Sequence, residues 1–130
     1  MSGRRSIEVE GFRHGAQPIP AASRVGPLVV TGSIFGLDRE LGAIPDDAAE
    51  QVRLVFDNLA AIMTAAGGSL DSVAKLSFQV RESGIRPLVN DAWLGVFPDA
   101  AARPARHVTA NSDLAANILV QCEAIAWITA

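Results

Sequence analysis

The sequence predicts an α+β domain in which a mixed sheet carries single helices on one face. The 130 residues fit one domain spanning residues 1–130, and 49% of them are hydrophobic, enough for a substantial core. Two segments have the apolar periodicity of amphipathic helices, and five have the apolar runs or the alternation of strands. Their order along the chain is strand, strand, helix, strand, helix, strand, strand, without an internal repeat.

The first 36 residues contain two predicted strands. Ile7 and Val9 alternate with polar residues in a short strand, after which prolines and glycines divide the chain into loops and edges. The apolar, β-branched run 28–36 predicts a central strand that ends at a tight turn. Within it, Gly32 and Ser33 place backbone N–H groups where a ligand could approach closely. A simple β-bulge at Gly32 explains the same residues equally well.

The first predicted helix has clear signals at both ends. Asp46 or Asp47 offers an N-cap, and Glu50 stands three residues after Asp47, as in a capping box. Apolar residues then recur every three or four positions as far as Ala66, which indicates a helix of about five turns. The glycine pair 67–68 suits the left-handed conformation that commonly follows a helix.

A strand and a second helix follow. Residues 73–80 alternate cleanly, so one face of the strand packs on the core and the other is polar. The helix begins around Ser83, has Pro87 in its first turn and ends before Pro98. Asn90 lies off its apolar face, where such a residue is more often simply solvated. The residues of that apolar face are Leu88, Ala92, Trp93, Val96 and Phe97.

The last two predicted strands, 106–110 and 118–128, carry the most suggestive pair of charges. If they form an antiparallel hairpin around the loop 111–117, Arg106 lies nearly opposite Glu123. Such a pair can be a surface salt bridge, worth only about 0–1 kcal/mol. Alternatively, it can be a carboxylate-binding cation beside an acceptor for water. Spacing alone favours the ordinary ion pair.

Composition excludes several classes of function. The net charge is −3 with a pI of about 5.2, and Lys75 is the only lysine, so neither nucleic acid nor an anionic membrane is expected as a partner. No apolar run is long enough to span a membrane, and no secretory signal is visible, which makes a soluble cytoplasmic protein the expectation. The single cysteine, Cys122, allows no intrachain disulfide and is typical of a small buried hydrophobe.

Cofactor signatures are also missing. His14, His107 and Cys122 lack the spacing of metal ligands, so no metal is predicted. Neither phosphate-binding glycine loops nor the nucleophile elbow Gly-x-Ser-x-Gly occurs. The remaining possibilities are an enzyme that works without a cofactor or a binding protein without catalytic activity.

The chain resembles the RidA (YjgF) family of enamine and imine deaminases from about residue 18 to residue 126. The most specific part of the resemblance is Arg-Pro-Ala-Arg at 103–106 with Glu-Ala-Ile-Ala at 123–126. The other segments that carry it are 28–33, 65–68, 89–90, 97–98 and 120–122.

The resemblance implies a chorismate-mutase-like fold with a mixed, mostly antiparallel sheet, assembled as a homotrimer with a barrel-like core and active sites between subunits. It implies a cofactor-free hydrolase that converts 2-imino or enamino acids, such as 2-aminoacrylate, to 2-keto acids and ammonia. Arg106 matches the arginine that binds the substrate carboxylate, and Glu123 the glutamate that orients water. Gly32, Ser33, Asn90 and Val108 match positions around the substrate.

The chain departs from the family pattern near the pocket. It contains no tyrosine, Val108 replaces the cysteine that follows the family arginine, and Gly32-Ser33 reverses the usual order. Deamination of another amino compound such as 2-aminomuconate is therefore an alternative, as is a non-catalytic trimeric metabolite-binding protein. An endoribonuclease role, also claimed within the family, fits an acidic chain poorly.

Overall fold

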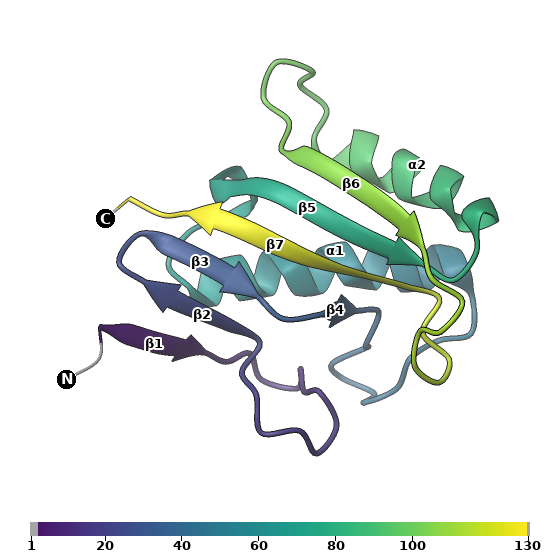
Figure 1. Ribbon diagram of the computed structural model, residues 1–130, viewed down its shortest axis with the longest axis horizontal. Helices are drawn as coiled ribbons and strands as arrows, with labels where there is room; N and C mark the ends of the chain where they lie inside the picture. The colour runs from purple at the N-terminus through teal and green to yellow at the C-terminus, as the bar shows by residue number, and fades with distance from the viewer. Residues whose placement is uncertain (1–2, 130) are drawn as a thin grey trace.

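One sheet and two helices form the layers of the computed structural model, which describes residues 3–129 (Figure 1). The seven-stranded sheet has the order β1-β2-β3-β7-β5-β6, with β4 also paired to β7. Every pairing is antiparallel except that of β5 with β6, so the sheet is mixed and mostly antiparallel, as predicted. The strands are β1 (Arg4–Ile7), β2 (Ala22–Val25), β3 (Leu28–Thr31), β4 (Ile34–Phe35), β5 (Val73–Val80), β6 (Ala105–Ala110) and β7 (Val120–Trp127).

The helices α1 (Ala48–Ala65) and α2 (Arg86–Val96) cover the same face of the sheet (Figure 1). Both ends of α1 are as predicted, because Asp47 Oδ2 accepts a hydrogen bond from Glu50 N at 3.0 Å and Gly67 follows with a φ of +98°. In α2, Pro87 lies in the first turn, and Val89 and Trp93 are the buried residues. The predicted apolar face of α2 is therefore rotated slightly, since Leu88 is only half-buried.

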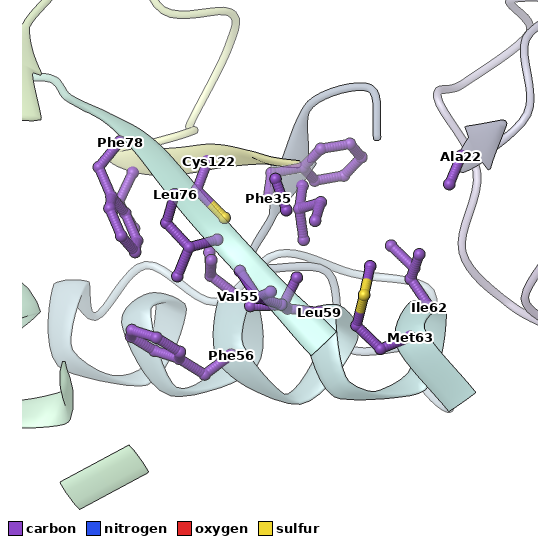
Figure 2. Close-up of a cluster of buried hydrophobic side chains, with 14 of the residues drawn as sticks. Ala22, Phe35, Val55, Phe56, Leu59, Ile62, Met63, Leu76, Phe78 and Cys122 are labelled. Carbon is purple, nitrogen blue, oxygen red and sulfur yellow. The ribbon is translucent and has the colours of Figure 1, made fainter. Parts of the chain in front are cut away.

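The core lies between the sheet and α1. Figure 2 shows side chains of α1 directed toward Leu76 and Phe78 of β5 and Cys122 of β7. The rings of Phe56 and Phe78 are 5.7 Å apart between centroids, within the range of favourable aromatic pairs. Burial of one face of β5 and β7 fixes which residues of these strands remain available for function on the opposite face.

The predicted hairpin between the last two strands is wrong. β5 lies between β6 and β7, pairing with β6 in parallel and with β7 antiparallel. Arg106 is in register with Leu76 rather than with Glu123. The physical reason is the helix between β5 and β6, because a strand–helix–strand segment returns the chain parallel to its first strand. The loop after β6 then carries the chain across to the far side of β5.

The predicted strand 28–36 is interrupted at Gly32-Ser33. Val30 pairs with Ile125 and Ile34 with Cys122, so β3 and β4 contain one residue more than the matching stretch of β7. This extra residue is a β-bulge, as the alternative interpretation of Gly32 proposed. Strand β2 was not predicted, because the prolines and glycines that flank it indicated a loop.

The sheet face away from the helices, called here the outer face, carries an exposed apolar patch. Leu28 pairs with Trp127 and Val30 with Ile125, and these four side chains are 39–59% exposed. Val25 extends the patch onto β2. Contiguous exposed apolar groups of this kind typically mark an interaction surface. Among the described residues, no helix is both long and apolar enough to cross a membrane.

Candidate active site

Arg106 lies on β6, the edge strand of the sheet, with its side chain directed toward α2. Its Nη2 donates a hydrogen bond of 2.6 Å to Asn90 Oδ1, and its guanidinium carbon is 5.0 Å from the centroid of the Trp93 ring. A hollow of about 470 Å³ beside it is lined by Asn90, Trp93, Leu94 and Arg106, and is called here the arginine pocket. Stacking on Trp93 and the bond to Asn90 fix the orientation of the guanidinium.

The charge of Arg106 has no carboxylate partner within residues 3–129. Partial burial lowers its pKa, and the neighbouring charge of Arg86 lowers it further. The group nevertheless remains a cation at neutral pH, because an arginine guanidinium titrates far above it. The N–H groups that Asn90 leaves free are therefore available to a carboxylate, for which a guanidinium offers a planar, bidentate fork.

The bulge at Gly32-Ser33 lies beside β7, and the strands β7 and β5 separate it from β6, which carries Arg106. His14 Nε2 donates a hydrogen bond of 2.7 Å to the carbonyl oxygen of Ser33. The His14 ring is held edge-on by Phe12 at 5.4 Å and Phe35 at 5.7 Å between centroids. His14 thus holds the bulge in place through this hydrogen bond. The sequence did not predict a contact between the two segments.

A polar chain runs across the outer face from this bulge. Gln121 Nε2 donates to Ser33 Oγ at 3.4 Å and to Gln79 Oε1 at 3.3 Å. Asn111 Nδ2 donates to the same Gln79 oxygen at 3.1 Å. These bonds link the bulge before β4, the strands β7 and β5, and the residue after β6 through side chains rather than backbone. Gln79 was predicted to lie on a polar strand face. The hydrogen-bond network could not be predicted, because that would have required the strand order, which the sequence did not reveal.

Glu123 lies next along β7 on the same outer face, and it is exposed. Ser77 of β5 is in register with Glu123 on one side and with His107 on the other. Adjacent strands are about 4.8 Å apart, so Glu123 and His107 flank Ser77 with their backbones on the order of 10 Å from each other. A carboxylate, a hydroxyl and an imidazole therefore form one row that a small polar molecule could span.

The predicted site residues thus fall into two groups. Asn90 and Val108 accompany Arg106 at the α2 side of the sheet, whereas Gly32 and Ser33 accompany Glu123 at the outer face. Side chains alternate along a strand, and Arg106 shares the face of buried Leu76 while Glu123 shares that of Ser77. Arg106 and Glu123 of one chain consequently point to opposite faces. Within residues 3–129, no group of three or more His, Cys, Asp or Glu could hold a metal ion.

The sequence model of the family described as Endoribonuclease L-PSP matches residues 16–128. The 2-iminobutanoate/2-iminopropanoate deaminase of Salmonella typhimurium is 26% identical over 123 residues, which cover 94% of this chain and 96% of that protein.

Solved structures agree with this similarity. The crystal structure of RidA from the Antarctic bacterium Psychrobacter superposes with a TM-score of 0.86 at 26% identity, covering 95% of this chain and 99% of that one. The structure of Escherichia coli TdcF with bound serine superposes with a TM-score of 0.87 at 25% identity, covering 96% and 99%.

Proposed function

Because the chain belongs to the Endoribonuclease L-PSP family and to its RidA-type members, we propose that it hydrolyses reactive 2-imino and enamino acids to 2-keto acids and ammonia. The observation that carries the proposal is Arg106, a half-buried guanidinium that is oriented by Asn90 and has no carboxylate partner among the described residues. Such a group is a prepared receptor for the carboxylate of a small acid.

The reaction needs only water as a second reactant. An enamino acid such as 2-aminoacrylate first tautomerises to the imine. Water then adds to the imine carbon, and the resulting carbinolamine releases ammonia and leaves the 2-keto acid. In this scheme Arg106 holds the substrate carboxylate, and Glu123 accepts a hydrogen bond from the attacking water and orients it. The bulge at Gly32-Ser33 and the side chain of Val108 complete the walls around the substrate.

Arg106 and Glu123 can act on one substrate only if two copies of the chain meet. Within one copy they face opposite sides of the sheet, with β5 between their strands. The exposed apolar patch on the outer face of β2, β3 and β7 provides a surface for a second copy to bury. We therefore propose a homotrimer with a barrel-like centre, in which each site takes Arg106 from one subunit and Glu123 from its neighbour.

A coupled assay tests the proposal. A serine or threonine dehydratase generates the imino acid in situ, and ammonia release is followed with and without the purified protein. We expect Arg106→Ala to lower kcat/KM about 10- to 100-fold, because a lost charge-assisted hydrogen bond costs about 1.5–3 kcal/mol. Arg53→Ala removes an exposed arginine of α1 and serves as the matched control. Full activity of Arg106→Ala would show that the carboxylate clamp is wrong.

Two alternatives predict different results. The first alternative is a non-catalytic metabolite-binding protein. The absence of tyrosine and the presence of Val108 favour this role more strongly here than in a chain that keeps the family pattern. That role predicts a thermal shift with 2-ketobutyrate but no acceleration of ammonia release. The endoribonuclease activity in the family description predicts RNA cleavage that persists through purification, which the net charge of −3 disfavours.

A further inference from the structure

Among the described residues, every backbone polar group of the bulge at Gly32-Ser33 has a hydrogen-bond partner except one. The N–H of Gly32 donates to the carbonyl oxygen of Ala21 at 3.0 Å. The carbonyl oxygen of Gly32 accepts from Thr31 Oγ1 at 2.8 Å, and the same hydroxyl accepts from the N–H of Ala124 at 2.9 Å. The N–H of Ser33, a half-buried residue, has no acceptor in this part of the chain. Folded proteins rarely leave such a group unpaired, so this donor is available to a ligand oxygen.

His14 holds the remaining polar group of the bulge, the carbonyl oxygen of Ser33, through the bond of 2.7 Å from its Nε2. A carbonyl oxygen can only accept, so Nε2 carries a proton and is not free to act as a base. The edge-on contacts with Phe12 and Phe35 keep the plane of the imidazole in place. The ring also lies against Gly32, where an added Cβ atom would be 3.6 Å from Nε2.

The direction of the free N–H depends on two anchored peptide groups. The peptide group between Gly32 and Ser33 carries this N–H, and it is anchored through its carbonyl oxygen by Thr31. One such bond leaves the group able to rotate about it, and glycine resists backbone rotation less than any other residue. The bond from His14 anchors the next peptide group along the chain. With both groups anchored, the rotation is blocked and the N–H of Ser33 has one direction.

We propose that His14 is a positioning residue of the active site, which acts through Ser33 by orienting the free N–H of the bulge toward the substrate carboxylate. The carboxylate is the only oxygen acceptor that an imino or enamino acid carries before water adds to it. Its two oxygens have room for several donors, so the N–H can bind it together with Arg106. The inference rests on the proposed deaminase function, because it assigns a further contact of the same substrate.

The coupled assay at increasing imine supply tests this role with two variants of His14. His14→Phe keeps a ring between Phe12 and Phe35 but has no donor, whereas His14→Gln places an amide nitrogen where histidine has Nε2. A carboxylate is bound alike in the ground state and the transition state. We therefore expect His14→Phe to raise KM about three- to tenfold, with kcat changed by about twofold or less. His14→Gln should return KM to within about twofold of the wild type.

Binding of 2-ketobutyrate, a stable product, gives a second measurement that needs no turnover. Titration calorimetry should show affinity about three- to tenfold weaker in His14→Phe and close to the wild type in His14→Gln. Gln17→Leu, an exchange at an exposed site of the same segment, should change neither KM nor affinity. Far-ultraviolet circular dichroism checks that each variant folds. If His14→Phe does not fold, His14→Asn takes its place, since its shorter side chain does not reach Ser33.

The outcomes separate the role of His14 from the proposed function. Unchanged KM and affinity in His14→Phe, or a loss that His14→Gln does not restore, overturns the positioning role. Either result together with hydrolysis of 2-aminoacrylate leaves the deaminase intact. Binding of 2-ketobutyrate that depends on His14, without hydrolysis of any imine, supports the positioning role and refutes the deaminase. A wild-type protein that neither binds the keto acid nor hydrolyses the imine refutes both.

Discussion

Replacing Gln51 with leucine should destabilise the protein through hydrogen bonds rather than through packing. Gln51 is a fully buried polar residue of α1. Its Nε2 donates to Pro45 O at 2.7 Å and to Asn117 O at 2.9 Å, and its Oε1 accepts from Leu119 N at 2.9 Å. One amide therefore ties two loops, the one before α1 and the one before β7, to the core. Leucine has nearly the same volume but leaves all three backbone groups without their partner.

The size of the effect follows from where those three groups lie. Each buried donor or acceptor that loses its partner costs about 1–3 kcal/mol. Asn117 is exposed and Pro45 is half-buried, so water replaces part of what their carbonyls lose. Leu119 is also half-buried, and its N–H faces the buried amide oxygen of Gln51. We therefore expect Gln51→Leu to lower the free energy of unfolding by about 2–4 kcal/mol, after a small gain from the added apolar surface.

Urea unfolding measures this change. Tryptophan fluorescence reports the transition, and for a slope of about 2 kcal/mol/M the midpoint should fall by roughly 1–2 M. All variants are compared at one protein concentration, because subunit association would otherwise shift the midpoint. Gln17→Leu makes the same exchange at an exposed site and should stay within about 0.5 kcal/mol of the wild type. A loss below 0.5 kcal/mol in Gln51→Leu would refute the reasoning.

Two further predictions concern the outer face and the core. Trp127→Asp places a charge in the exposed apolar patch, and we expect the assembly measured by light scattering to dissociate to smaller species, whereas Leu41→Asp, at another exposed apolar residue outside the patch, leaves it unchanged. Burial, with a smaller contribution from Glu123, raises the pKa of the Cys122 thiol, so the native protein contains less thiolate than a free cysteine would. Cys122 should accordingly react with a disulfide reagent at pH 8 only after unfolding, and rapid reaction of the folded protein would contradict its burial.

The features that the sequence predicted well are those with local causes. The beginning of α1 depends on a side chain three residues from its bonding partner, and its end depends on a glycine φ angle. The alternation of β5 from Leu76 to Val80 follows from the face that it buries, whereas a register shift between Val73 and Lys75 interrupts the predicted alternation at the start of the strand. Such signals are contained within a few neighbouring residues, which is why residue spacing was sufficient to find them.

Strand pairing could not be found in this way. The short loop between β6 and β7 suggested a hairpin, but β5, which precedes both, occupies the position between them. Pairing is decided by which apolar faces can be buried together, and that depends on the whole sheet. This strand order also determines the candidate site, because the side chain of Arg106 points toward α2 and away from Glu123. The hydrogen bond from Arg86 to the carbonyl oxygen of Val108 could not be predicted either, since the two residues are 22 positions apart in the sequence.

The central place of β7 also has a consequence for how the chain is made. β7 pairs with β3, β4 and β5, and all of these precede it in the sequence. Before residue 120 is synthesised, the native strand pairings can produce only two separate sheet fragments, β1-β2-β3 and β5-β6, with no strand to join them. Both fragments expose backbone edges during that interval, when they are vulnerable to mispairing with other chains. We therefore expect the nascent protein to need protection until β7 has left the exit tunnel and closes the sheet.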